Sequence, residues 1–475
     1  MSTRAGPSAE GANLTPIALL VASILFIQNL DGAVIVTSLP QMAGSLGAST
    51  VALNTGITAY FIATAAFIPL SGWITDRLGA KLVLAGAILV FSLGSAGCAA
   101  AGTLPEFICA RVIQGIGGAM MMPVGRIVVL RTARKDQLLA ATSLITWPAL
   151  LAPVVGPIIG GAITTWLNWR WNFLINLPLG CIAIGLVFWL VPDEKEPGRR
   201  SLDVTGLILC SFALSLLIYA LDGLATESPI ALPLVVLLLG CGSGLAATRW
   251  FGKAATPLLD LSSLKVRSFK IAVVDAGNLI RLSISATPFL LALMLQTVWK
   301  LNPLETGTVL LVYFVGNLAM KTVTSPLLRL LGFRPLLFAN GIAVALSIAA
   351  IPLLSWSHLT ALSVALLLFA GAARSMQFTA INTLTFADIP KQHTASSSTL
   401  ASMMQQLSMA LGVALAAICL RVGIAVRGAA TPDASDFAAA YLVTALCALA
   451  GALLTLRLAG DAGAEVRGRP VGKPS

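Results

Sequence analysis

Five ionisable residues lie deep inside long apolar stretches of this sequence. They are one acid, Asp31, and four bases, Arg111, Arg281, Lys321 and Arg374. A charged side chain at the centre of a membrane helix costs about 2.5–3.5 kcal/mol on insertion scales, so such residues are rare and usually functional. Each of the five is therefore a candidate for binding a charged ligand or for carrying a proton.

Asp31 and Arg111 have the residue types of a proton-exchange site. Burial favours the protonated form of a carboxyl group, whereas a nearby cation favours its ionised form. A carboxylate held between these two influences can load and release a proton, so we expect Asp31 and Arg111 to couple protons to a conformational change. The alternative is a permanent ion pair that only holds two helices together.

The composition indicates an integral membrane protein. Of 475 residues, 57% are hydrophobic and only 10% are charged, whereas soluble domains carry about 25% charged residues. The formal net charge is +11, but the Lys and Arg residues lie at the ends of apolar stretches, where membrane topology explains them. We therefore expect the lipid bilayer, and not a nucleic acid, as the partner of this basic chain.

Several other classes are excluded by missing motifs. The sequence contains no Walker G-x-x-x-x-G-K-[ST], so we expect no ATP hydrolysis. The two histidines, His358 and His393, both fall between apolar stretches, and the seven cysteines form no C-x-x-C pair. We therefore predict neither a metal site nor another cofactor.

The apolar stretches must position the five charged residues. A membrane-spanning helix needs about 20 mainly apolar residues. Fourteen stretches satisfy this requirement: 15–38, 51–73, 82–101, 105–129, 138–165, 172–191, 203–222, 230–250, 270–297, 305–328, 335–355, 359–385, 396–422 and 437–458. With both termini in the cytoplasm, this count places most Lys and Arg residues on the cytoplasmic side.

A faint internal repeat suggests two related halves. Aligning Gly79 with Gly332 places Lys81 on Arg334, and repeated halves are typical of transporters. We predict two six-helix halves with an inserted helix pair between them. The expected borders are a cytoplasmic tail at 1–14, the first half at 15–192, the inserted pair with its linkers at 193–269, the second half at 270–458, and a cytoplasmic tail at 459–475.

Five short motifs occur in order at the predicted helix positions. They are residues 30–40 (LDGAVIVTSLP), 72–81 (GWITDRLGAK), 111–119 (RVIQGIGGA), 153–161 (PVVGPIIGG) and 169–178 (WRWNFLINLP). Together they resemble the major facilitator superfamily, in particular its 14-helix drug:proton antiporter branch. The resemblance implies an all-α fold of 14 transmembrane helices. If the inserted pair is set aside, helices 1, 4, 9 and 12 of this chain correspond to the helices that line the central cavity in the superfamily.

Two of these motifs have the chemistry of moving parts. Asp76 and Arg77 could pair across the ends of neighbouring helices and act as a conformational latch, because exposed ion pairs contribute only about 0–1 kcal/mol; a solvated charged turn is the alternative. Prolines and glycines in the fifth stretch could allow bending. The predicted latch and hinge residues are Gly72, Asp76, Arg77, Gly79, Lys81, Pro153, Gly156, Pro157, Gly160 and Gly161.

Two substrate classes remain open at this point. The resemblance implies a proton-coupled exporter of lipophilic drugs in a bacterial inner membrane, acting as a monomer. Arg281, Lys321 and Arg374 instead suggest an organic anion, such as a carboxylate or its metal chelate. The predicted cavity residues are these three cations with Gln28, Asn278 and Asn382. A membrane receptor or enzyme is the third alternative, and the absence of a catalytic constellation argues against it.

Overall fold

The computed structural model describes residues 14–48, 50–134, 137–193, 201–225, 231–301, 303–354, 360–390, 393–429, 431–464 and 466. Every regular element in these ranges is a helix, which confirms the all-α prediction. Long apolar sequences adopt helices in a membrane because the helix satisfies all backbone hydrogen bonds within one segment.

The first bundle contains the N-terminal helices. Within it α1 packs along α6, α5 packs between α2 and α4, and α4 packs on α8. The helices are α1 (Leu14–Leu46), α2 (Thr50–Phe67), α3 (Leu70–Leu78), α4 (Ala80–Ala100), α5 (Leu104–Thr132), α6 (Leu138–Trp166), α7 (Trp171–Leu174) and α8 (Asn176–Leu190).

The second bundle contains the C-terminal helices. Here α12 packs on α17 and α18, α13 packs on α16, and α15 packs on α16 and α18. The helices are α11 (Arg267–Val273), α12 (Ala276–Thr297), α13 (Pro303–Ala319), α14 (Lys321–Leu331), α15 (Phe333–Ala350), α16 (Ala361–Ala387), α17 (Thr394–Arg427) and α18 (Ala434–Thr455), with a short η3 (Ile351–Leu353) after α15.

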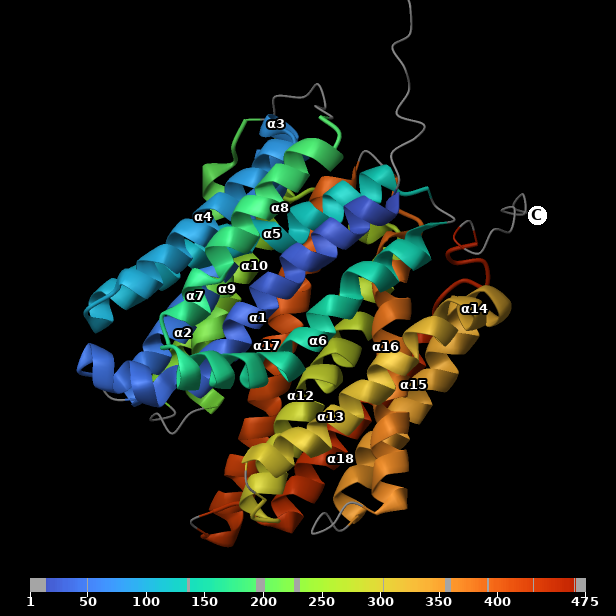
Figure 1. Ribbon diagram of the computed structural model, residues 1–475. Helices are drawn as coiled ribbons and strands as arrows, with labels where there is room; N and C mark the ends of the chain where they lie inside the picture. The colour runs from blue at the N-terminus through green and yellow to red at the C-terminus, as the bar shows by residue number, and fades with distance from the viewer. Residues whose placement is uncertain are drawn as a thin grey trace, which may run out of the picture.

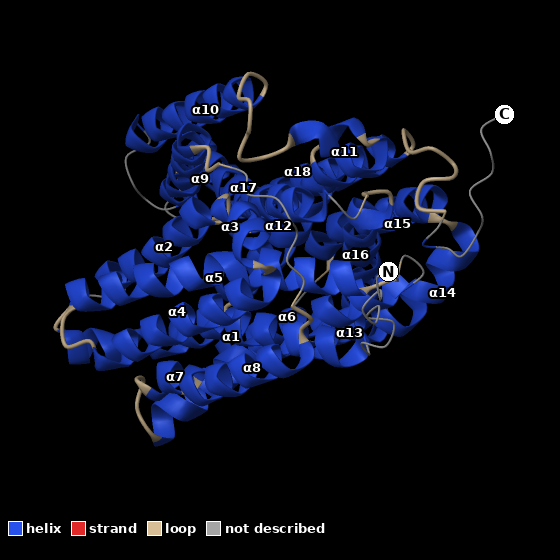
Figure 2. Ribbon diagram, turned by 90° about the horizontal axis from the view of Figure 1, so that it is seen from above, coloured by secondary structure: helices blue, strands red, loops and turns tan. Residues whose placement is uncertain are grey.

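A further helix pair joins the two bundles at one side. Helix α9 (Val204–Ala225) packs against α10 (Ala231–Phe251) and also contacts α2 of the first bundle and α17 of the second. Figure 2 shows α10 at the periphery, with α9 between it and the rest of the molecule. The short helix η2 (Leu261–Lys265) then leads into α11.

The number of membrane-length helices is close to the predicted number. Among the described residues, 11 helices are long and apolar enough to cross a membrane, or up to 13 if each bent pair is one span. The predicted stretch 138–165 coincides with α6, many of whose side chains lie outside the described set. The count of fourteen therefore stays a prediction.

Two of the predicted stretches are each divided into two helices with a bend between them. The stretch 51–73 is divided into α2 and α3, which are bent by 57°, and the stretch 305–328 into α13 and α14, bent by 44°. Pro69 lies in the first break, directly before α3, and lacks the backbone N–H that a continuous helix needs. Consequently, residues 72–78 of the GWITDRLGAK motif are helical and do not form a loop.

The two bundles meet at the end of the molecule that contains α3, which we call the α3 end. In Figure 1 they lie together at the upper right and diverge toward the lower left and the bottom. Ser71 Oγ lies 3.0 Å from Thr399 Oγ1, and Ser398 Oγ donates to the carbonyl of Pro123 at 3.0 Å. These four residues join α3 and α5 to the first turns of α17.

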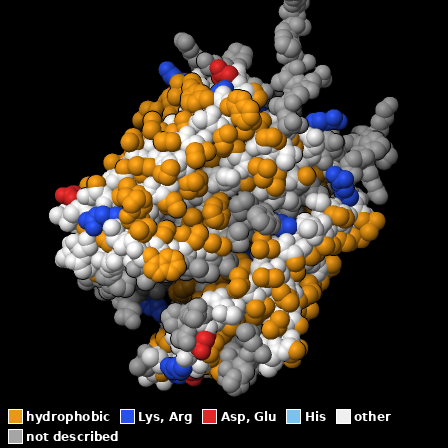
Figure 3. All heavy atoms as spheres, in the orientation of Figure 1, with side chains coloured by type: hydrophobic (Ala, Val, Ile, Leu, Met, Phe, Trp, Pro, Cys, Tyr) orange, Lys and Arg blue, Asp and Glu red, His pale blue; other side chains and the backbone are white. Residues whose placement is uncertain are grey.

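The molecular surface agrees with a membrane environment. On the face shown in Figure 3, hydrophobic side chains cover most of both bundles, and most Lys, Arg, Asp and Glu side chains lie at the edges. Exposed leucines and phenylalanines of this kind would be unfavourable in water over so large a patch. This distribution places the helices in a bilayer.

Candidate functional site

Glycines on α4 and α5 bring these helices and α2 into close contact. An ideal Cβ added to Gly94 would lie 2.5 Å from the backbone nitrogen of Gln114, and one added to Gly115 would lie 2.6 Å from the carbonyl oxygen of Tyr60. Small residues allow such backbone contact between membrane helices. As a result, polar side chains from α2, α4 and α5 reach one another across short distances.

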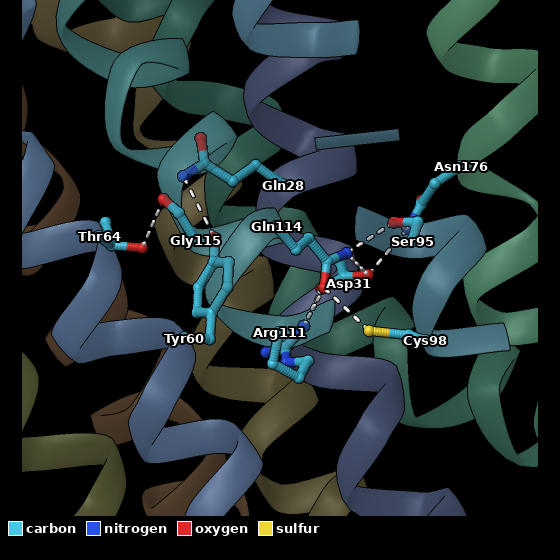
Figure 4. A network of polar contacts seen from close by, with 10 residues as sticks. All are labelled: Gln28, Asp31, Tyr60, Thr64, Ser95, Cys98, Arg111, Gln114, Gly115 and Asn176. Carbon is cyan, nitrogen blue, oxygen red and sulfur yellow. Dashed lines mark hydrogen bonds and ion pairs between the residues drawn. The ribbon is translucent and has the colours of Figure 1, made fainter. Parts of the chain in front are cut away.

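Asp31 of α1 accepts three hydrogen bonds from two other helices, α5 and α8 (Figure 4). Arg111 Nη1 lies 2.8 Å from Asp31 Oδ2, while Gln114 Nε2 and Asn176 Nδ2 donate to Asp31 Oδ1 at 2.9 and 2.8 Å. The side chains of Asp31 and Arg111 are 0% and 1% exposed. The structure thus brings together the two residues that the sequence singled out for proton coupling.

A second set of contacts holds these donors in place. Ser95 Oγ accepts from Gln114 Nε2 at 2.6 Å and from Asn176 Nδ2 at 3.0 Å. The guanidinium of Arg111 lies over the ring of Tyr60, 4.3 Å from its centroid, and Arg111 Nη1 also donates to Gln114 Oε1 at 2.5 Å. A buried network of this kind is stable only while its members remain paired.

Gln28, predicted as a cavity residue, lies beside this network. Its Nε2 donates to the carbonyl of Gly118 at 3.0 Å and to Tyr60 Oη at 3.4 Å. Gln28 Oε1 is buried without a hydrogen-bond partner. Gln28 and Asp31 lie about one helical turn apart on α1, and both are linked to α5.

The predicted cations of the second bundle do not form one cluster. Arg281 Nη1 donates to the carbonyl of Ala272 at 2.8 Å, and Nη2 donates to Asn382 Oδ1 at 3.0 Å. The structure therefore brings Arg281 and Asn382 together. Asn278, one turn before Arg281, accepts from Ser408 Oγ at 2.6 Å and links α12 to α17.

Lys321 and Arg374 form a separate pair of basic side chains. Lys321 begins α14 at the bend after α13, and its Nζ donates to Thr379 Oγ1 of α16 at 2.8 Å. Arg374 of α16 stacks on two aromatic rings of α13. Both cations are less than a tenth exposed.

The predicted latch is built differently from the expectation. Asp76 pairs with Arg131 of α5, with Arg131 Nη2 3.4 Å from Asp76 Oδ1. Arg77 instead lies over the ring of Trp73, 5.2 Å from its centroid. Asp76 thus contacts a cation of the neighbouring helix α5, whereas Arg77 contacts a ring on its own helix; a latch role for the two residues stays a prediction.

The remaining residues of the same motif have structural positions. Gly79 joins α3 to α4 with φ 85°, a backbone conformation that favours glycine. Gly72 lies against Thr399, because its Cβ position is 2.8 Å from Thr399 Oγ1. Lys81 Nζ lies 5.9 Å from the ring centroid of Phe188.

Helix α6 carries the predicted hinge and is continuous through it. Gly156 packs directly on Ala33 of α1, the carbonyl of Gly160 accepts from Thr164 Oγ1 at 2.6 Å, and the Cβ position of Gly161 has no neighbour within 4 Å. The side chains of Pro153 and Pro157 lie outside the described set. Bending at α6 therefore stays a prediction.

Sequence reasoning missed several residues that the structure places at these sites. Gln114 lies in the motif at 111–119 and Asn176 in the motif at 169–178, so the motifs were the sequence feature that could have identified them. Arg126 gave no such signal, because its depth depends on how far α5 extends. Its Nη2 donates to Gln405 Oε1 at 3.2 Å, and its guanidinium lies 5.6 Å from the ring centroid of Phe386. Arg126 thus connects α5 to α16 and α17.

Metal binding receives no support from the described part of the chain, where no group of three His, Cys, Asp or Glu side chains could hold an ion. The candidate site is instead a charge-balanced acid–base pair inside a helical bundle. Two such bundles of membrane-length helices, packed together at one end, define a polytopic membrane protein of transporter architecture.

Comparisons with known proteins identify the family. The model of the Major Facilitator Superfamily matches residues 21–413 and 276–470, and the chain belongs to this family. Its motifs are thus confirmed as those of a major facilitator protein.

Relatives in three bacteria carry the provisional description of a multidrug resistance protein, MdtD. The Yersinia enterocolitica protein is 34% identical over 94% of this chain and 95% of its own length. Those of Cronobacter sakazakii and Serratia proteamaculans are 34% and 35% identical, over 90% and 84% of this chain and 90% and 84% of their own lengths.

Solved structures share the fold at low sequence identity. The human organic anion transporter MFSD10 superposes with a TM-score of 0.63 at 15% identity, covering 95% of this chain and 100% of that one. The Escherichia coli fucose:proton symporter FucP gives a TM-score of 0.61 at 11% identity, covering 94% and 98%. These similarities confirm the predicted major facilitator fold.

Proposed function

We propose that this protein is a proton-coupled antiporter that exports small molecules by alternating access, in the manner of a multidrug efflux pump. The observation that carries the proposal is the fully buried Asp31, paired with Arg111 and bonded to two amides. Substrates of major facilitator proteins bind near the midplane between the halves. The descriptions of the relatives support drugs as the exported class.

The chemistry of Asp31 suggests how a proton would drive movement. An ionised carboxylate only accepts hydrogen bonds, whereas a protonated one carries an O–H donor and has fewer acceptor sites. Asp31 accepts from Arg111, Gln114 and Asn176. Protonation would therefore leave Arg111 without its counter-charge and place an O–H donor among groups that are themselves donors. A movement of α1 relative to α5 would then be less costly, because the ion pair between these helices would be lost.

The contacts at the α3 end support an assignment of states and sides. We place this end, with both termini, in the cytoplasm of a bacterial cell, which agrees with the distribution of Lys and Arg along the chain. The described conformation would then be closed toward the cytoplasm. We propose the first half as 15–192, the second as 270–458 and α9 with α10 as the inserted pair, acting as a monomer without ATP and without chemical change of the substrate.

The proposal is tested with purified protein in liposomes that carry an imposed pH gradient. Wild-type protein should move a cationic dye against its gradient, and Asp31→Asn should abolish this proton-driven movement. Asp222→Asn is the matched control, because Asp222 is an exposed acid at the far end of α9. Undiminished proton-driven efflux by the Asp31→Asn protein would contradict the proposal.

A second candidate is the export of an organic anion. Arg126, Arg281, Lys321 and Arg374 are buried or half-buried, and none of them has an acid partner among the described residues. Uncompensated buried cations favour a negatively charged ligand. The same liposomes, loaded with a tricarboxylate in place of the dye, test this candidate. Movement of the tricarboxylate and not the dye would replace the first substrate class by the second.

A further inference from the structure

A second buried polar cluster lies where α13, α14 and α16 meet, apart from the Asp31 network. Gly316 of α13 faces the carbonyl of Leu368, and Gly371 of α16 faces the carbonyl of Tyr313, so closely that a Cβ at either glycine would collide. The two backbones therefore touch at this level. The chain bends by 44° between α13 and α14 directly afterwards, and the side chains beyond the contact are forced together.

Two cations occupy this junction. The guanidinium of Arg374 lies over the rings of Tyr313 and Phe314, with centroids at 5.6 and 5.5 Å. Lys321 Nζ donates to the hydroxyl of Thr379 at 2.8 Å. The ion pairs of the described residues include neither Lys321 nor Arg374. Two like charges are thus held near one another without compensation, an unfavourable arrangement unless an anion is present.

Buried polar atoms without partners lie on the same two helices, α13 and α16. Arg374 Nε and Nη1 are buried and have no hydrogen-bond partner, and the same is true of both polar atoms of Asn317. Asn317 is 1% exposed. It lies four residues after Tyr313 and four before Lys321, so these residues follow one face of the α13–α14 segment. Buried donors are normally paired. A single negatively charged group could accept hydrogen bonds from both Arg374 and Asn317.

Arg281 differs from Arg374 in this respect. Both of its Nη atoms are already bonded within the protein, to Ala272 and Asn382. Only Arg281 Nε is left without a partner. The sequence does not distinguish the two arginines as candidates for binding an anion. The contacts do, because Arg374 has more donors without a partner than Arg281 has.

The junction also adjoins the other bundle. Helices α13, α14 and α16 each contact α6 of the first bundle. Lys321 and Arg374 retain 9% and 8% exposure, so the cluster is not completely sealed.

We propose that Arg374, Lys321 and Asn317 bind one anionic group, such as a carboxylate, between α13, α14 and α16. Arg374 and Lys321 supply the charge, Asn317 supplies an amide donor, and the rings of Tyr313 and Phe314 hold the guanidinium flat. The anion is either the acidic group of a transported substrate or a small resident anion. The substrate source rests on the proposed transport function, whereas the site itself does not.

The test measures anion binding by the purified full-length protein in detergent, without a gradient. Chloride, phosphate, succinate and citrate are titrated separately while the thermal unfolding midpoint is recorded, because a ligand that binds only the folded state raises it. We expect at least one of these anions to give a saturable rise. Its apparent affinity should fall at least 10-fold in Arg374→Gln and in Lys321→Gln, and less in Arg374→Lys, which keeps the charge. Arg249→Gln removes an exposed cation of α10 and is the matched control.

The outcomes separate the two sources and the two proposals. Binding of a carboxylate that is also carried across liposomes identifies the substrate, whereas binding of chloride or phosphate without carboxylate transport identifies a resident anion. The site is refuted if no anion of the panel shifts unfolding, or if Arg374→Gln and Lys321→Gln bind as the wild type does. If the wild-type protein binds the anion but its transport does not depend on the proton gradient, only the antiport proposal is refuted.

Discussion

Ser71 Oγ of α3 and Thr399 Oγ1 of α17 lie 3.0 Å apart, although 328 residues separate them in sequence. Each residue belongs to a different bundle, and both are buried. Gly72 beside Ser71 also lies against Thr399. This contact closes the α3 end, so alternating access requires that it opens and forms again in every cycle.

The first prediction follows from this distance. The double variant Ser71→Cys with Thr399→Cys should form a disulfide on oxidation, because the two side chains already point at one another. The cross-link should stop transport, and a reductant should restore it. Protection of both thiols from a maleimide reagent measures the bond, in a background without the seven native cysteines, all of which are free. Continued transport by fully cross-linked protein would show that this contact does not open.

The second prediction concerns the glycine packing behind Asp31. Gly94→Ala should lower stability by about 1–3 kcal/mol, because overpacking forces helices apart and the added methyl would meet the backbone of Gln114. Gly86→Ala on the same helix is the control, since nothing lies within 4 Å of its Cβ position. That control should be neutral or stabilising by up to about 1 kcal/mol. Thermal unfolding in detergent measures both; equal midpoints would contradict the packing described.

The third prediction concerns the contact between Asp76 and Arg131. In a double-mutant cycle, Asp76→Asn and Arg131→Gln should couple by about 0.2–1 kcal/mol, because their side chains are 30% and 10% exposed and partly screened. The cycle of Asp76→Asn with Arg77→Gln should show less coupling, since Arg77 stacks on Trp73. Unfolding midpoints of the single and double variants provide the measurement. A larger Asp76–Arg77 coupling would contradict the assignment of Arg131 as the cation that pairs with Asp76.

The fourth prediction concerns pH and the start of α18. The carboxylate of Asp433 accepts from the backbone nitrogen of Ser435 at 2.8 Å, and Arg427 Nη1 lies 3.0 Å away. The hydrogen bonds from Ser435, more than the charge of Arg427, lower the pKa of Asp433.

Because the folded pKa lies below the unfolded value, this stabilisation is present above about pH 3.9 and is lost as the pH falls through the lowered pKa. The unfolding midpoint should therefore fall more in acid for wild-type protein than for Asp433→Asn. Equal acid dependence of the two proteins would contradict the role of this carboxylate.

Much of the fold and the central pair could be predicted from sequence. Composition gave the membrane class, and hydrophobic stretches located most helices to within a few residues. Asp31 and Arg111 could be found because an isolated charge in an apolar stretch is conspicuous. Their neighbours Gln114 and Asn176 were harder to assign, since a neutral amide in a membrane helix is more often a packing contact.

Other features depend on three-dimensional distances that a sequence does not contain. The partner of Asp76 is on α5, and the choice between Arg77 and Arg131 follows from how α3 is bent. The position of Arg126 between the bundles also depends on the fold, because α5 continues to Thr132 and brings the side chain to Gln405 of α17. The sequence also does not show that Arg281 is hydrogen-bonded within the described part of the protein and Arg374 is not, because this depends on which donors lie close to carbonyl oxygens in the fold.

Helix α9 has a consequence for how a lipid-soluble molecule could reach the space between the bundles. Because α9 contacts both α2 and α17, it closes one of the two seams along which the bundles meet the bilayer. Arg421 of α17 also donates to the carbonyl of Leu224 at 2.9 Å, which fastens α9 near the end of the molecule opposite α3. A compound arriving sideways from the membrane on this side would therefore meet α9 before it reached either bundle.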